Sequence, residues 1–111
     1  RPAVPHNAKL QQVVLEMSSG RCGATAVLEG DEVLGIITDG DLRRAMENGL
    51  GTDAEAIQLM NADPKKMASD ALAVGAFQLM EKHSISQIMV MDHERYVGIV
   101  HLHDILREGI F

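Results

Sequence analysis

One internal repeat constrains the fold of this chain more than any other feature of its sequence. Residues 35–38, Gly-Ile-Ile-Thr, return as Gly-Ile-Val-His at residues 98–101, so the two copies are offset by the 63 residues that separate Gly35 from Gly98. Without a gap, the same offset pairs further residues of identical type: Ala8 with Ala71, Met17 with Met80, Asp41 with Asp104 and Arg44 with Arg107. A match that runs without a gap through several expected elements predicts two copies of one structural unit.

Hydrophobic periodicity gives each copy the order helix, strand, strand, helix. The first helix of the first copy has an apolar face at helical spacing, formed by Leu10, Val13, Val14 and Met17. The corresponding face in the second copy is formed by Ala73, Ala76, Phe77 and Met80. Asn7 and Asp70 precede these helices as the expected N-caps.

Short apolar runs predict buried strands at residues 24–28, 33–38, 88–91 and 96–101, joined by tight turns at residues 30–31 and 92–94. The second helix of each copy is expected to begin near residues 39–41 and 103–104, and to end before Gly49 and Gly109. Two further short strands are expected at residues 3–4 and 65–67.

The segment between the copies predicts one more short helix, which Thr52 and Glu55 would open as a capping box and which would end near Met60. Nothing before Arg1 matches this helix, so we expect the chain to be an excised piece. We therefore divide it into a first motif at residues 1–51, truncated at its start, and a second motif at residues 52–111 that includes its leading helix. Because a unit of about 60 residues is marginal alone, the copies should pack sheet against sheet about a pseudo-twofold axis, with one core and a cleft between them.

Composition and charge exclude several classes of function. Ten Lys and Arg against sixteen Asp and Glu give a net charge of −6, and aromatic residues make up 3%, which argues against nucleic-acid binding. No apolar run of about 18 residues predicts a membrane span, and residues 1–5 lack the pattern of a signal peptide. A single cysteine, Cys22, forms no internal disulfide, which is typical of a cytoplasmic protein.

The two copies, each with Gly-Ile-Ile-Thr-x-x-Asp or its variant at the second strand-to-helix junction, resemble a tandem pair of CBS motifs, also called a Bateman module. This resemblance covers essentially the whole chain. It implies an α/β fold of two β-α-β-β-α units, each with a three-stranded sheet, and a ligand cleft between them.

A narrower resemblance rests on residues 38–44, Thr-Asp-Gly-Asp-Leu-Arg-Arg, and residues 101–107, His-Leu-His-Asp-Ile-Leu-Arg. Both are similar to the C-terminal CBS pair of bacterial arabinose-5-phosphate isomerases, which serve Kdo synthesis for lipopolysaccharide and capsule. In that family a sugar isomerase (SIS) domain that carries the active site precedes the pair. The chain has no such domain, so no catalytic residue is carried over and we expect no isomerase activity from this chain alone.

Candidate ligand-binding residues of the first copy are Thr38, Asp41 and Arg44. The resemblance implies that the Thr38 hydroxyl and nearby amides meet a phosphate, while Asp41 accepts hydrogen bonds from ribose hydroxyls. A strand that runs into a helix also offers free N–H groups to an anion. The alternative is that Asp41 only caps the helix and forms an i, i+3 ion pair with Arg44.

The second copy offers His101, His103, Asp104 and Arg107 as its candidates. His101 stands where the first copy has Thr38, so the two half-sites differ chemically, and a protonated His101 could donate to a phosphate or a sugar-acid carboxylate. His101, His103 and Asp104 also permit a minority interpretation as metal ligands, but the spacing supplies no fourth ligand and we expect no metal site.

These features favour a regulatory module that senses a nucleotide or nucleotide-sugar and oligomerises its parent isomerase. The resemblance suggests CMP-Kdo, or an adenine nucleotide such as AMP or ATP, as the ligand, and no required cofactor. Exposed apolar positions on the second helices, Leu42 with Ala45 and Ile105 with Leu106, favour a homodimer. The competing hypothesis is a dimerisation module that binds no ligand.

Overall fold

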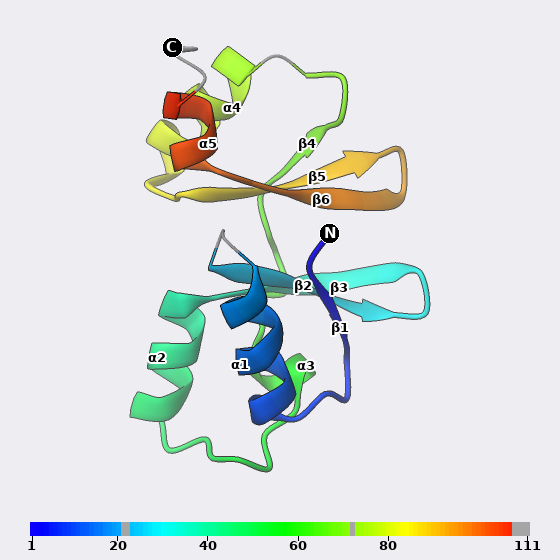
Figure 1. Ribbon diagram of the computed structural model, residues 1–111, viewed down its shortest axis with the longest axis vertical. Coiled ribbons are helices and arrows are strands. Elements are labelled where there is room, and N and C mark those ends of the chain that lie inside the picture. The colour runs from blue at the N-terminus through cyan, green and yellow to red at the C-terminus, as the bar shows by residue number, and fades with distance from the viewer. Residues whose placement is uncertain (21–22, 72, 108–111) are drawn as a thin grey trace.

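The computed structural model describes residues 1–20, 23–71 and 73–107, and it folds into two similar units of strands and helices (Figure 1). The first unit contains β1 (Ala3–Pro5), α1 (Leu10–Ser19), β2 (Ala24–Glu29), β3 (Glu32–Thr38), α2 (Asp39–Glu47) and α3 (Ala56–Leu59). The second contains β4 (Lys66–Ala68), α4 (Ala73–His83), β5 (Gln87–Asp92), β6 (Arg95–His101) and α5 (Leu102–Arg107). The α/β class and the β-α-β-β-α order of each unit are confirmed.

Both sheets have the same topology and register. Each is three-stranded, in the orders β1-β2-β3 and β4-β5-β6, with a parallel first pair and an antiparallel hairpin. Ala26 faces Ile36 in the first hairpin, and Met89 faces Ile99 at the matched position of the second. The register shifts at Val27/Leu28 and at Val90/Met91, so the repeat extends to the irregularities of the hydrogen-bond ladder.

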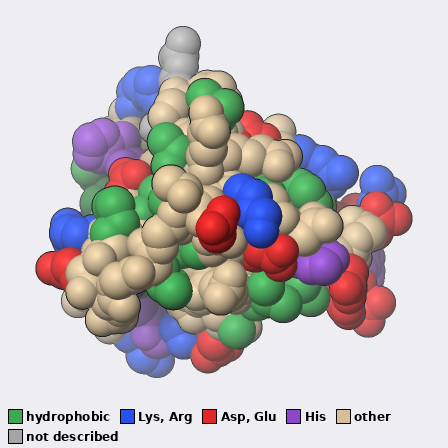
Figure 2. Space-filling model, turned by 90° about the horizontal axis from the view of Figure 1, so that it is seen from below, with side chains coloured by type: hydrophobic (Ala, Val, Ile, Leu, Met, Phe, Trp, Pro, Cys, Tyr) green, Lys and Arg blue, Asp and Glu red, His purple; other side chains and the backbone are tan. Residues whose placement is uncertain are grey.

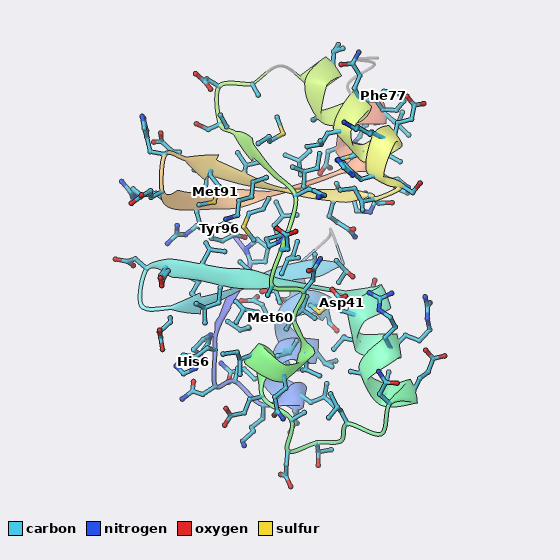
Figure 3. All side chains as sticks on the ribbon, turned by 180° about the vertical axis from the view of Figure 1, so that it is seen from behind. His6, Asp41, Met60, Phe77, Met91 and Tyr96 are labelled. Atoms are coloured by element: carbon cyan, nitrogen blue, oxygen red, sulfur yellow. The ribbon has the colours of Figure 1, made fainter. Side chains whose placement is uncertain are left out.

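The sheets face each other in the middle of the molecule, and the helices cover their outer faces (Figure 1). Ala24, Ala26 and Ile36 of the first sheet pack there with Met89 and Tyr96 of the second. Figure 3 shows Tyr96 in the space between the two sheets. Two further apolar clusters lie under the helices, one in each unit. Each sheet is therefore buried on both faces, and the expectation of a single core is wrong because the core is divided into three layers.

The starts of two helices, α1 and α3, differ from the sequence-based expectations. Asn7 is not the N-cap of α1, which begins at Leu10 after an extended Lys9 with no side-chain cap. Thr52 does not open α3 either: the helix begins at Ala56, and the Glu55 N–H donates to Gln58 Oε1 at 2.8 Å. Of the two expected stop glycines, Gly49 has a positive φ of 85° after α2, and Gly109 lies outside the described residues, as does Cys22.

Backbone pairing between two loops explains both differences. The Ala56 N–H donates to the Ala8 carbonyl at 2.8 Å, and the Leu10 N–H donates to the Ala54 carbonyl at 3.1 Å. Residues 54–57 therefore supply partners for the backbone that leads into α1, and the side-chain caps are not needed. As a result, the helix that opens the second repeat packs in the first unit, where Ala54, Ala56 and Leu59 join its core.

The outer surface is mixed in character. Seen from below, the end of the molecule shows Lys and Arg side chains interspersed with acidic and apolar ones (Figure 2). None of the helices in the described part of the chain is long and apolar enough to cross a membrane.

Replacing Gly35 should destabilise the fold, whereas the same change at the matched Gly98 should not. A Cβ on Gly35 would collide with the Asn61 carbonyl and come within 2.8 Å of Met60 Sδ, but one on Gly98 would meet nothing within 4 Å. We expect Gly35→Ala to lower the free energy of unfolding by about 1–3 kcal/mol, and Gly98→Ala to leave it unchanged or raise it by about 0.5 kcal/mol. Urea denaturation of the two variants measures this, and equal effects would contradict it.

Candidate functional site

A cavity of about 590 Å³ opens between the two units at the carboxyl end of β3. Three segments form its walls. The first is the β3–α2 junction, with Thr38, Asp41, Arg43 and Arg44; the second is the linker, residues 61 and 63–65; the third is the loop after α4, residues 83–87. The loop after α4 thus faces the β3–α2 junction across the cavity.

Thr38 and Asp41 form a reciprocal capping box at the start of α2. The Asp41 N–H donates to Thr38 Oγ1 at 3.3 Å, and Asp41 Oδ2 accepts from the Thr38 N–H at 2.9 Å and from its hydroxyl at 3.0 Å. Arg44 donates to the other carboxylate oxygen, Oδ1. The alternative interpretation of these residues, a cap with an i, i+3 ion pair, is therefore present in the structure.

This arrangement leaves Asp41 with some capacity for a ligand. A carboxylate offers about four acceptor positions, and the three bonds from Thr38 and Arg44 use most of them. The Asp41 side chain is 11% exposed and the Arg44 side chain 62% exposed. One ligand hydroxyl can therefore bind directly, and a second can bind if the exposed Arg44 turns away.

Positive charge gathers in this cavity although the chain as a whole is acidic. Arg43, Arg44 and Lys65 line it together with the carboxylates of Asp41 and Asp63, in a chain with a net charge of −6. The start of α2 adds the positive end of a helix dipole. The cavity is thus suited to an anion, and two apolar side chains in its wall, Ile36 and Ile85, offer contacts to a flat apolar group.

Sequence reasoning singled out part of this lining and missed the rest. Arg43, Asn61, Asp63 and Lys65 line the cavity but were not among the seven candidate residues. Asn61 reaches the cavity because its backbone pairs with Ile36, at 3.0 Å and 2.8 Å. Its position at the end of the linker helix was the only available signal.

The candidates of the second copy lie elsewhere. His101, His103, Asp104 and Arg107 line a separate, more open depression of about 550 Å³ at the end of β6. The seven candidate residues therefore form two groups, one for each copy, and they do not converge on one cavity. The second depression lacks the wall that the linker gives to the first.

A backbone hydrogen bond to its ring favours the neutral form of His101. Its Nδ1 accepts from the His103 N–H at 3.0 Å, and the two rings pack edge to face with centroids 4.7 Å apart. Burial, and secondly the charge of His103, lower the pKa of His101 below its usual 6.5, while Asp104 opposes this shift. A neutral His101 is a weaker partner for an anion than the protonated form considered from the sequence.

The metal interpretation gains no support from this geometry. Within residues 1–20, 23–71 and 73–107, no three His, Cys, Asp or Glu side chains converge as a metal site would require. The Nδ1 lone pair of His101 is occupied by the His103 N–H.

Comparison with known proteins now identifies the family. The model of the CBS domain matches residues 2–48 and again residues 54–110. The chain belongs to the CBS domain family. Arabinose 5-phosphate isomerase KdsD of Yersinia pestis is 34% identical over 111 residues, which cover 98% of this chain and 34% of that protein. The chain thus spans about a third of the length of its curated relatives, and both resemblances noted from the sequence are confirmed.

Solved structures confirm the fold of a CBS pair. The CBS-domain containing protein ATU1752 from Agrobacterium tumefaciens superposes with a TM-score of 0.86 at 19% identity, over 97% of this chain and 83% of that one. The CBS domain protein PAE2072 from Pyrobaculum aerophilum, complexed with AMP, superposes with a TM-score of 0.84 at 22% identity, over 97% of this chain and 91% of that one.

The two aspartates of the CBS pair should differ in their contribution to stability. Asp41 satisfies the Thr38 N–H and hydroxyl in a largely buried position, whereas the Asp104 side chain is 50% exposed and accepts from the His101 N–H and from Arg107. We expect Asp41→Ala to lower the free energy of unfolding by about 1–2 kcal/mol, and Asp104→Ala by less than about 1 kcal/mol. Chemical denaturation at pH 7 compares them, and a larger loss for Asp104→Ala would contradict the capping geometry.

His101 should titrate below pH 6.5, as followed by NMR of its ring protons. Because burial and His103 lower its pKa and Asp104 raises it, His103→Gln should move the midpoint up and Asp104→Asn should move it down. Because folding lowers the pKa of His101, its contribution to the free energy of unfolding is fully present above pH 6.5. This contribution is lost as the pH falls through the pKa of His101 in the folded protein. His101→Asn should remove that part of the pH dependence, and an unchanged profile would contradict it.

Proposed function

We propose that this CBS pair is the regulatory, ligand-sensing and oligomerising part of an arabinose-5-phosphate isomerase, and that the cavity beside Thr38 binds a nucleotide or a nucleotide-sugar. The observation that carries this proposal is the cavity itself, which brings Arg43, Arg44 and Lys65 together at the start of α2 in an acidic chain. A CBS domain protein of the same fold that is complexed with AMP supports the class of ligand.

The lining suggests how such a ligand would lie. The phosphate would meet the cationic side chains of Arg43 and Lys65, near the Arg44 guanidinium, which lies over Gly40. Asp41 would accept from a ribose hydroxyl with its remaining capacity. The base would contact Ile36 and Ile85, which line the same cavity.

The parent protein enters this proposal through its relatives. The chain covers 34% of the Yersinia pestis isomerase, so most of such a protein, including its isomerase active site, would lie outside this chain. We propose that the parent is cytoplasmic, that it serves Kdo and lipopolysaccharide synthesis, and that CMP-Kdo or an adenine nucleotide is the regulatory ligand. The chain itself would then be without catalytic activity.

A second candidate function, a dimerisation module without ligand, is supported by exposed apolar side chains on the helices. Of the positions predicted to be exposed, Ala45 and Ile105 are wrong, because they are buried in the core at 7% and 4% exposure, and only Leu106 is exposed, at 41%. Leu15 is 63% exposed and Met46 59%, and burial of such positions in a twofold partner would stabilise a homodimer. The capping role of Asp41 also suits a module that binds nothing. Dimerisation is compatible with ligand binding, so the two functions differ only in whether the cavity is used.

Calorimetric titration and thermal unfolding with AMP, ATP and CMP-Kdo test the proposal. A ligand at one hundred times its dissociation constant should stabilise the chain by about 2.7 kcal/mol. Lys65→Gln should weaken binding by about one to two orders of magnitude because it removes a charged donor from the cavity. The neighbouring Lys66→Gln is the matched control, since Lys66 lines a different depression of the surface.

Two outcomes would decide against the ligand cavity. If none of the three compounds shifts the unfolding temperature, the ligand-free dimerisation module is favoured. If a compound binds and Lys65→Gln and Lys66→Gln weaken it equally, the ligand lies outside this cavity. Asp41→Asn is a less clean probe, because one oxygen of the amide cannot replace both oxygens of the capping carboxylate.

A further inference from the structure

Within the described residues, the first unit has a layer that the second unit lacks. In the first unit, residues 54–61 run along the edge of β3 and over the start of α1, where α3 lies beside α1 (Figure 1). Ala54, Ala56 and Leu59 enter the core there, and Met60 lies beside the first sheet (Figure 3). No described segment takes the corresponding place on the second unit, since positions 63 residues before 54–61 would precede Arg1.

The matched apolar positions of the second unit are correspondingly open. Four residues of the first unit that this layer helps to cover are buried: Val4 at 2% exposure, Ala8 at 3%, Val27 at 0% and Ile37 at 0%. Their counterparts at the offset of 63 residues are Met67, Ala71, Val90 and Val100, of which Ala71 is exposed and the others are only partly buried. We call these four counterparts the second-unit groove.

An unpaired length of backbone borders this groove. In the first unit, Ile36 exchanges two hydrogen bonds with Asn61, at 3.0 Å and 2.8 Å. Ile99 holds the matched position and faces Met89 in the hairpin. The Met89 N–H points away from β6 and donates to the Lys65 carbonyl. Such a non-hydrogen-bonded pair directs the N–H and C=O of Ile99 to the open edge of β6, where no described residue meets them.

Gly98 provides an independent indication. Its counterpart Gly35 has to be glycine, because a Cβ there would collide with the Asn61 carbonyl. Gly98 has nothing within 4 Å of a Cβ, so the contacts present in this chain do not require a glycine there. If the backbone of another segment paired with Ile99 in the way that Asn61 pairs with Ile36, its carbonyl would leave no room for a Cβ at residue 98. Such a pairing would therefore require the glycine.

The position of the chain start indicates where the occupant would come from. Arg1 donates through its guanidinium to the Tyr96 carbonyl on β6, and the Pro2 carbonyl accepts from the Tyr96 hydroxyl at 2.6 Å. The N-terminus lies between the sheets, beside β6 (Figure 1). At about 3.3 Å per residue, a few residues before Arg1 would suffice to reach Ile99, which lies three positions beyond Tyr96 on the same strand.

We propose that the second-unit groove and the edge of β6 at Ile99 bind a polypeptide segment that enters over Arg1 in the longer parent chain. This segment would pair one extended residue with Ile99 and place a helical turn with small and aliphatic side chains, as in Ala56 and Leu59, over the groove. It would tie the second unit to whatever precedes the CBS pair. This inference shares one assumption with the proposed function, namely that the parent protein is longer than this chain.

A chain with a defined extension tests the proposal. A copy of residues 52–63 is fused directly before Arg1. This junction preserves the repeat, because Arg1 corresponds to Pro64 at the offset of 63 residues. A scrambled copy of the same composition is the control. We expect the native-order extension to slow amide hydrogen exchange of Ile99 at least tenfold and to raise the unfolding temperature by about 4 °C or more, with no change for the scrambled extension.

Gly98→Val then shows whether the segment docks as described. In the extended chain it should abolish both effects, and in the original chain it should change the unfolding temperature little, because a Cβ at this position meets nothing within 4 Å. Ala71→Glu, an exposed position in the groove, is the second variant should Gly98→Val fold poorly, and it should abolish the gain in the same way.

Three results would overturn the proposal. One is an Ile99 amide that exchanges equally fast with and without the extension. Another is a thermal gain that survives both Gly98→Val and Ala71→Glu, which would place the segment elsewhere. The third is a dimer of the original chain that Gly98→Val dissociates in light scattering, which would make this groove an interface between two copies. Since no nucleotide enters these measurements, their failure would leave the proposed ligand cavity standing, and the reverse also holds.

Discussion

The backbone pairing of Ile36 with Asn61 is the interaction on which much of this structure depends. It fastens the end of the linker to the edge of the first sheet, through hydrogen bonds of 3.0 Å and 2.8 Å. Because the linker is held there, α3 packs into the first unit and residues 61–65 become a wall of the cavity. The same close approach explains why Gly35 has no side chain. At Ile99, where no described residue makes this pairing, the second unit has an open edge and a more open depression instead.

The strand-to-helix junctions show how one structural element can serve both stability and binding. At the first junction, Thr38 and Asp41 satisfy each other's backbone groups, and the same carboxylate faces the cavity with one acceptor position left. At the second, His101 replaces Thr38 and its ring accepts a backbone N–H, which favours a neutral imidazole. The two units thus share a fold and a hydrogen-bond register, but among the described residues the first presents the less open cavity, with two arginines and a lysine in its wall. A stabilising role for Asp41 does not exclude a binding role, because the capping bonds leave part of the carboxylate available.

Several features could be predicted from the sequence because they depend on local patterns. The offset between Gly35 and Gly98 located both hairpins and both strand-to-helix junctions, since alternating and helical periodicities are properties of neighbouring residues. Asp41 could be identified as a cap or a ligand for the same reason. The caps at Asn7 and Thr52 were predicted wrongly, because backbone groups from a distant segment satisfy the helix ends there. No local pattern reveals such a partner.

The sequence by itself determined that the chain is a repeat, that each copy is a β-α-β-β-α unit, and which residues stand at the ends of β3 and β6. Only the tertiary structure decided how the copies share segments. It placed the helix of the second repeat in the first unit, brought Arg43 and Lys65 to one cavity, and separated Thr38 from His101. The physical reason is that these outcomes depend on which distant backbone edge a linker pairs with and on which apolar surface it covers. Such pairings are selected by the burial available in the assembled fold, whereas a strand or a capping box is encoded by residues a few positions apart.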